Sequence, residues 1–117
     1  MDKVEMQART KVFALRILKL SEALPHTVSG RTLAGQIVRS ATSVAANYRA
    51  ACRARSKADF IAKLGIVEEE SDESQFWLEM IDEAGLLPSE RLEALKKEAD
   101  ELTAIVVSSI KTAKRGR

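Results

Sequence analysis

The side chains of this sequence that could do chemistry are mainly basic, and they are spread unevenly along the chain. Residues 1–57 hold 11 of the 19 Lys and Arg residues but only 3 of the 17 Asp and Glu residues. Clustered cations bind phosphate groups and gain free energy from the counterions that they release. The sequence therefore offers candidate contacts to RNA or DNA at Arg9, Arg16, Lys19, Arg39, Arg49, Arg53 and Arg55.

Aromatic residues that could stack on nucleic-acid bases are scarce, at 4% of the chain. Tyr48 is the one candidate near the basic residues, and its place in an apolar stripe predicts that it is buried. Contacts to phosphates position a nucleic acid but do not read its bases. Binding through these residues would therefore show little sequence preference. A basic helix matched to an acidic helix within one bundle would explain the same charges equally well.

Acidic residues dominate the second half of the chain, beginning with the run Glu68–Glu73. Carboxylates on facing helices can hold two metal ions, but that design also needs Glu-x-x-His motifs on two helices. The chain has a single histidine, His26, which is predicted to lie in an exposed loop. We therefore expect no metal and no other cofactor, and we interpret the acidic run as a solvated or ion-paired helix face.

Cys52 is the remaining candidate for chemistry, because neighbouring arginines would favour its thiolate form. The sequence has no histidine that could lie beside it in a helix and act as a base. We interpret Cys52 as a small buried residue that packs against another helix. Since no nucleophile–base pair or phosphate-binding loop is readable, the sequence predicts neither an enzyme nor a small-molecule substrate.

The elements that must position these residues are predicted to be long helices, because two prolines and five glycines interrupt 117 residues. The first helix is expected from about Asp2 to Ala23, with Pro25 ending it and a loop over residues 25–31. Spacings of three and four residues predict its buried face. That face comprises Val4, Ala8, Val12, Leu15 and Leu18, widened by Phe13, Ile17, Leu20 and Leu24.

The second helix is expected from Thr32 or Leu33 to about Arg53, with Thr32 as the N-cap. Asn47 falls near its apolar seam and is predicted to hydrogen-bond across a helix interface and fix the register, in preference to contacting a ligand. The seam itself alternates steps of four and three residues, through Ile37, Ala41, Val44, Tyr48 and Ala51.

The third helix is expected from Lys57 to Ala84, with Ser56 as its N-cap and Gly85 as a left-handed C-cap. Its apolar and small residues form a heptad seam, the pattern of bundles with nearly parallel axes. Phe76, Trp77 and Met80 fall outside that seam, so they predict either a subunit contact or a broad core face. The seam comprises Phe60, Leu64, Val67, Ser71, Ser74, Leu78 and Ile81.

The fourth helix is expected from Ser89 to about Thr112, followed by a frayed basic tail over residues 111–117. Short connections make neighbouring helices antiparallel. The sequence therefore predicts one all-α domain over residues 1–117, an antiparallel up-down-up-down four-helix bundle. The N-terminus has no signal-peptide pattern, and no stretch approaches the roughly 18 apolar residues that span a bilayer. We expect a cytoplasmic protein that does not contact a membrane.

One part of the sequence resembles a known family. The segment Gln36–Tyr48, followed by Arg53-x-Arg55-Ser56 and Asp59-Phe60, is similar to the signature of the bacterial four-helix bundle proteins named after the 23S rRNA intervening sequence. The resemblance covers most of the chain and implies an up-down bundle and, as in relatives, a ring-shaped homopentamer. A related group, the accessory proteins of diversity-generating retroelements, binds nucleic acid through the basic surface of such a ring. For most members no biochemical role is established.

Two functional hypotheses follow. The first is a non-enzymatic homo-oligomeric bundle whose basic surface contacts RNA or DNA. The alternative is a structural or protein-interaction module without a nucleic-acid role, in which the acidic third helix recognises a basic partner or the neighbouring subunit. If basic and acidic helices pair between subunits, salt should weaken the oligomer, because salt screens exposed charges.

Overall fold

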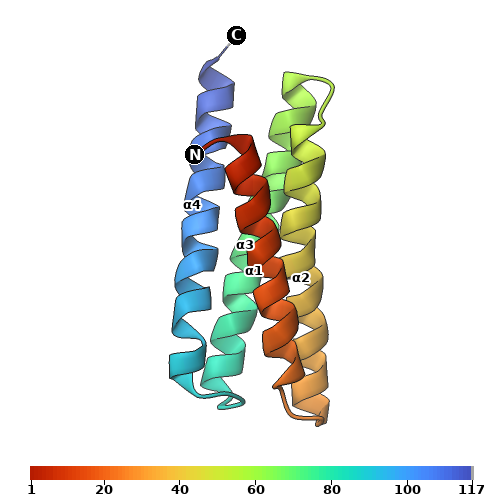
Figure 1. The fold of residues 1–117 in the computed structure, drawn as a ribbon, viewed down its shortest axis with the longest axis vertical. Coiled ribbons are helices and arrows are strands. Elements are labelled where there is room, and N and C mark those ends of the chain that lie inside the picture. The colour runs from red at the N-terminus through yellow and green to blue at the C-terminus, as the bar shows by residue number, and fades with distance from the viewer. Residues whose placement is uncertain (117) are drawn as a thin grey trace.

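Four long helices make up most of the chain in the computed structural model, which describes residues 1–116. They are α1 (Lys3–Glu22), α2 (Val28–Cys52), α3 (Lys57–Glu83) and α4 (Glu93–Arg115), and a short 3₁₀ turn, η1 (Ser89–Arg91), precedes α4. Consecutive helices run in opposite directions (Figure 1). The described residues contain no strand. The prediction of an all-α four-helix bundle is confirmed.

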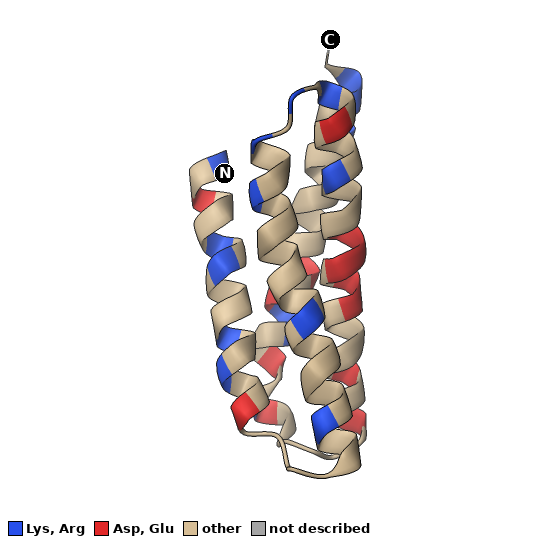
Figure 2. Cartoon of the chain, turned by 90° about the vertical axis from the view of Figure 1, so that its right-hand side faces the viewer, with Lys and Arg blue, Asp and Glu red and all other residues tan. Residues whose placement is uncertain are grey.

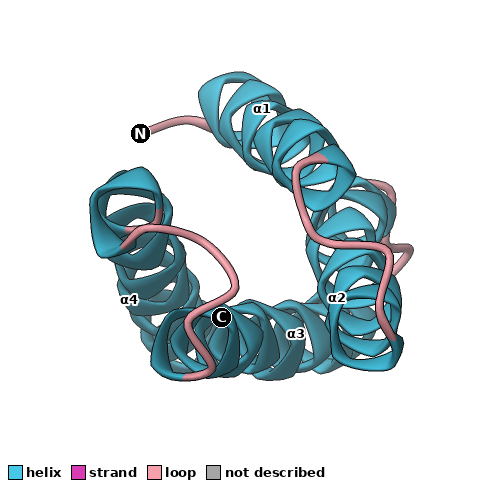
Figure 3. Cartoon of the chain, turned by 90° about the horizontal axis from the view of Figure 1, so that it is seen from below, coloured by secondary structure: helices cyan, strands magenta, loops and turns pink. Residues whose placement is uncertain are grey.

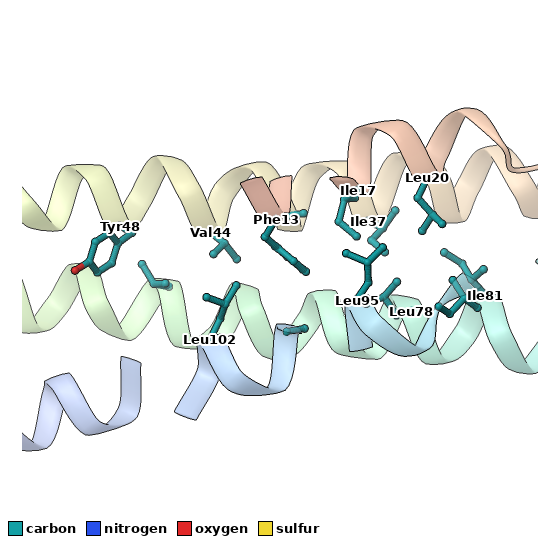
Figure 4. Packing of buried hydrophobic residues seen from close by; sticks show 14 of the residues in the cluster. Phe13, Ile17, Leu20, Ile37, Val44, Tyr48, Leu78, Ile81, Leu95 and Leu102 are labelled. Carbon is teal, nitrogen blue, oxygen red and sulfur yellow. The ribbon is translucent and has the colours of Figure 1, made fainter. Parts of the chain in front are cut away.

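The four helices follow one another around a shared apolar core, with α1 and α4 flanking its most open side (Figure 3). Side chains from all four helices meet in that core (Figure 4). Phe13 and Ile17 come from α1, Val44 from α2, Leu78 from α3 and Leu102 from α4, and all five are fully or almost fully buried. Burial of such side chains is the main force that holds helices of this length together.

The seam of α3 is buried where the heptad spacing predicts it, from Leu64 to Ile81. Its two serines make the polar contacts between helices. Ser74 Oγ lies 2.9 Å from Ser40 Oγ on α2, and Ser71 Oγ lies 2.7 Å from Thr103 Oγ1 on α4. These small residues allow close helix approach while each hydroxyl is paired inside the core.

The prediction for Asn47 is wrong. Its side-chain amide donates to the backbone carbonyl and the hydroxyl of Ser43, one turn earlier in the same helix. The serine pairs described above, and not Asn47, supply hydrogen bonds between helices. A short amide in a helix readily bonds to its own backbone, which satisfies the group without a partner helix.

The predicted buried face of α1 is also wrong. The core-facing side chains are Met6, Phe13, Ile17 and Leu20 with the hydroxyl residue Thr10. The helix therefore has two apolar stripes, and α2 and α4 cover only one of them. The other stripe lies largely in solvent, with exposed fractions from 39% to 76% for Leu18, Val12, Leu15 and Val4.

Helix α2 begins earlier than predicted, so residues 28–31 are helical and the predicted loop is too long. Thr27, not Thr32, is the N-cap, and its hydroxyl accepts a hydrogen bond from the Gly30 backbone N–H at 3.1 Å. A Cβ atom on Gly30 would lie 1.9 Å from the Pro25 carbonyl oxygen. The turn between α1 and α2 is therefore tight because residue 30 has no side chain.

The predicted caps of α3 are confirmed. The Ser56 hydroxyl accepts from the Asp59 backbone N–H at 3.0 Å, and Gly85 has a left-handed backbone with φ of 69°. Helix α4 differs from its prediction, because residues 89–91 form a 3₁₀ turn and the α-helix continues to Arg115. Most of the tail predicted to fray is thus helical, and Arg117 lies outside the described residues.

Candidate nucleic-acid interface

The basic and acidic residues lie on different helices. Lys and Arg residues run along α1 and α2 and over the turn between α2 and α3, whereas Asp and Glu residues follow α3 (Figure 2). The seven predicted contact residues nevertheless fall into three different surroundings. Their partners decide which of them remain available to a phosphate.

Arg9 on α1 is neutralised by α4. Its guanidinium makes a two-bond contact with the Glu98 carboxylate, at 2.8 and 2.7 Å, and a further bond to Glu101 at 2.7 Å. The Arg9 and Glu98 side chains are only 26% and 17% exposed. Hydrogen bonding from Arg9 lowers the pKa of Glu98, since it stabilises the charged carboxylate. Arg9 therefore joins two helices and is a poor candidate for binding phosphate.

Arg39 on α2 is neutralised by α3. It lies 3.0 Å from a carboxylate oxygen of Glu70 and also bonds to Glu73. Glu73 in turn accepts a hydrogen bond from the indole N–H of Trp77 at 3.0 Å. Arg9 and Arg39, named here the paired arginines, are the charge match within the bundle that the sequence left open as an explanation.

Arg16 and Lys19 lie together on α1, as predicted, but apart from the other candidates. They line a shallow hollow of about 270 Å³ with Arg91, which precedes α4, and with Leu20 and Leu95. None of these three cations makes an ion pair within residues 1–116. Arg16 is close enough to Glu98 to help lower the pKa of that carboxyl group.

Arg49, Arg53 and Arg55, named here the turn arginines, come together where α2 ends and α3 begins. They line a hollow of about 540 Å³ with Lys63 and Asp59, named here the turn hollow. No ion pair involves any of the turn arginines among the described residues. The hollow therefore holds four cations against one carboxylate.

Local structure explains why the turn arginines converge. Arg49 and Arg53 are four residues apart, which places them on one side of α2. The helix ends at Cys52, and the backbone N–H of Arg53 bonds to the Ala50 and Ala51 carbonyl oxygens. Ser56 then caps α3, so a turn of only a few residues brings Arg55 beside them. Ala46 and Ala50 line the same hollow and leave room for a ligand.

Lys63 is the contributor to the turn hollow that sequence reasoning missed. Its ammonium lies 2.7 Å from Asp59, one helical turn earlier. Hydrogen bonding from Lys63 is the main cause that lowers the pKa of Asp59, and the charge of Arg55 acts in the same direction. The signal in the sequence was the i,i+4 pair itself, which fixes one carboxylate and leaves the arginines without it.

The remaining candidates carry no further chemistry. Tyr48 is buried as predicted, and burial raises the pKa of its hydroxyl, so its ring does not stack on a base. His26 is exposed, and Cys52 is partly buried against the core. Residues 1–116 contain no group of three or more His, Cys, Asp or Glu side chains placed to hold a metal ion. No helix in that range is long and apolar enough to cross a membrane.

Comparison with known proteins agrees with the fold. A family model described as "23S rRNA-intervening sequence protein" matches residues 2–108. The chain is similar to a crystal structure of a protein with unknown function from the S23 ribosomal protein family of Bacteroides thetaiotaomicron VPI-5482. The two share 33% sequence identity with a TM-score of 0.88, over 95% of this chain and 99% of that chain. No curated protein matches the chain.

Proposed function

The chain belongs to the 23S rRNA-intervening sequence protein family, and on that premise we propose that it is a non-enzymatic, homo-oligomeric bundle that contacts RNA or DNA phosphates. The observation that carries the proposal is the turn hollow. Its three arginines have no carboxylate partner in the described chain, in contrast to Arg9 and Arg39. A phosphate backbone would supply the missing negative charges.

The chemistry of the turn hollow suits a phosphate backbone better than a base. Guanidinium groups bind phosphate oxygens through paired, charge-assisted hydrogen bonds. The aromatic residue nearest in sequence, Tyr48, is buried and offers no face for stacking. We therefore infer binding that depends strongly on salt and weakly on nucleic-acid sequence.

Two observations support a non-enzymatic role. The family and the similar crystal structure indicate no enzymatic activity. Within the described residues, the exposed His26 and the partly buried Cys52 lie on different turns at the two ends of α2. A cytoplasmic location, where nucleic acids are accessible, belongs to the same proposal.

The test is a fluorescence-anisotropy titration of labelled duplex DNA and of a structured RNA across a salt series. Binding at low salt with a linear fall of log affinity against log salt is expected, with a slope of about 0.9 for each duplex phosphate neutralised. The triple variant Arg49→Gln/Arg53→Gln/Arg55→Gln should bind more weakly. Its slope should be shallower by about 0.9 for each phosphate that the variant no longer neutralises.

A matched control removes three charges elsewhere, with Arg31→Gln/Lys97→Gln/Lys111→Gln. All three residues lie outside the turn hollow and make no ion pair within the described range. The control should keep a slope close to that of the unchanged protein. Equal losses of affinity in both triple variants would mean that net charge and not the turn hollow governs binding. No binding at low salt would overturn the nucleic-acid role and favour a protein-interaction module.

A further inference from the structure

The exposed apolar stripe of α1 has no partner within the described chain. Val4, Leu15 and Leu18 are 76%, 57% and 39% exposed. Beside them, a groove of about 640 Å³ between α1 and α2 is floored by alanines, including Ala8 and Ala45. Exposed apolar surface of this kind, bordered by charged residues, marks a contact site.

A second exposed apolar stripe follows the outer side of α3. Ile66, Phe76 and Met80 are 42%, 49% and 40% exposed. Phe76 meets the ring of Trp77 edge-on, with ring centroids 5.0 Å apart. This contact holds the exposed ring against a neighbour that is itself partly buried. The stripe is therefore a firm surface and not a set of loose side chains.

The two stripes have matching lengths and spacings. Val4 and Leu18 are 14 residues apart, and so are Ile66 and Met80. Fourteen residues of α-helix rise about 21 Å. Leu15 and Phe76 each lie about one turn before the end of their stripe. Because α1 and α3 run in the same direction (Figure 1), the stripes would match if two copies packed side by side in parallel.

The charges along the two stripes are opposite. Lys11 lies on the α1 side and lines the groove with Arg49 and Arg53. Glu69 and Asp72 are on α3, and neither makes an ion pair within residues 1–116. Opposite charges placed across apolar stripes steer two surfaces together and fix their register.

We propose that the outer face of α3 in one copy packs in parallel against α1, and the groove beside it, in the next copy. This inference rests on the homo-oligomer in the proposed function and names its interface. The contact joins two different faces, so it is heterologous and generates a ring when the rotation between copies closes. Parallel packing places the α2–α3 turn of every copy at one end of the ring, which concentrates the turn arginines there.

The experiment measures mass by light scattering coupled to gel filtration, with far-UV circular dichroism as a check of helix content. In the proposed register Leu18 faces Met80 of the next copy. Leu18→Glu sets an acid against the acidic α3, and Met80→Lys sets a base against the basic α1. Each single variant should show at least a twofold drop in mass. The double variant, in which Glu faces Lys, should recover the mass of the unchanged protein.

The matched control is Val28→Glu, because Val28 is 77% exposed and lies at the start of α2, away from both stripes. It should leave the mass unchanged. If a single variant loses helix, Leu15→Glu and Phe76→Lys replace the pair.

Each adverse outcome has its own meaning. If both single variants keep the full mass, the oligomer exists but this interface is wrong. If the singles lose mass and the double variant does not recover it, the Leu18–Met80 register is wrong. An unchanged protein that runs at 12.9 kDa would instead remove the homo-oligomer from the proposed function itself.

Discussion

The paired arginines and the turn arginines carry the same charge in opposite surroundings. Arg9 and Arg39 each bind two glutamates on a neighbouring helix. The turn arginines share a hollow in which the one carboxylate, Asp59, binds Lys63. The difference teaches that the basic count of a sequence divides into cations that hold the bundle together and cations left over for a ligand.

The largest effect expected from this comparison is on nucleic-acid affinity. Arg53→Glu/Arg55→Glu should lower affinity for duplex DNA more than about tenfold at low salt, because it removes two phosphate contacts and adds two repulsive charges. Arg9→Gln/Arg39→Gln should leave the affinity within about threefold, since those cations are already neutralised. Anisotropy titrations of both variants measure the contrast. A larger loss of affinity in the second variant would reverse it.

The next effect is on stability at Arg9. Arg9→Gln leaves Glu98, which is mostly buried, without its two-bond partner. We expect the free energy of unfolding to fall by about 1–2 kcal/mol. Urea denaturation measures the change, and a double-mutant cycle with Glu98→Gln isolates the pair. Arg53→Gln is the control and should change stability by less than about 0.5 kcal/mol. Equal effects of Arg9→Gln and Arg53→Gln would show that pairing does not distinguish the two groups.

Acid sensitivity should separate the same two groups. The pKa of Glu98 is lowered in the folded protein from its ordinary 4.5 by the Arg9 contact. A lowered folded pKa gives stability that is present above pH 4.5 and is lost as the pH falls through 4.5 toward the folded value. Urea midpoints measured between about pH 6 and pH 3 should therefore fall more steeply for the unchanged protein than for Arg9→Gln. Parallel curves would contradict the role assigned to Arg9.

The smallest effect is expected at Arg39. Its side chain is 48% exposed, so water and salt screen its pairs with Glu70 and Glu73. Arg39→Gln should cost at most about 0.5–1 kcal/mol, and the cost should shrink in high salt. Chemical denaturation at two salt concentrations measures this. A cost that is independent of salt would indicate that Arg39 stabilises the protein by packing.

Sequence reasoning reached the parts of the fold that depend on local pattern. The heptad spacing from Leu64 to Ile81, the Ser56 cap and the Gly85 cap each follow from neighbouring residues, and the structure has all of them. The stripe of α1 failed because Val4, Leu15 and Leu18 are spaced as regularly as Phe13 and Ile17. Only the placement of α2 and α4 decides which stripe is covered.

The candidate site was predictable in composition and not in arrangement. All seven basic residues could be named from the sequence, but Arg9 meets Glu98 and Arg39 meets Glu70 across large sequence separations. No local pattern encodes those partners. The convergence of the turn arginines, by contrast, follows from a short turn between two helices, and the i,i+4 pair Asp59–Lys63 was readable in advance.

The most direct test of the account follows the arginine side chains themselves. Nε–Hε resonances of the arginines can be assigned by substitution and recorded by NMR while duplex DNA is added at low salt. The account predicts that the signals of Arg49, Arg53 and Arg55 shift or broaden first, while those of Arg9 and Arg39 stay in place. Equal shifts in both groups, or shifts at Arg9 and Arg39 alone, would contradict it.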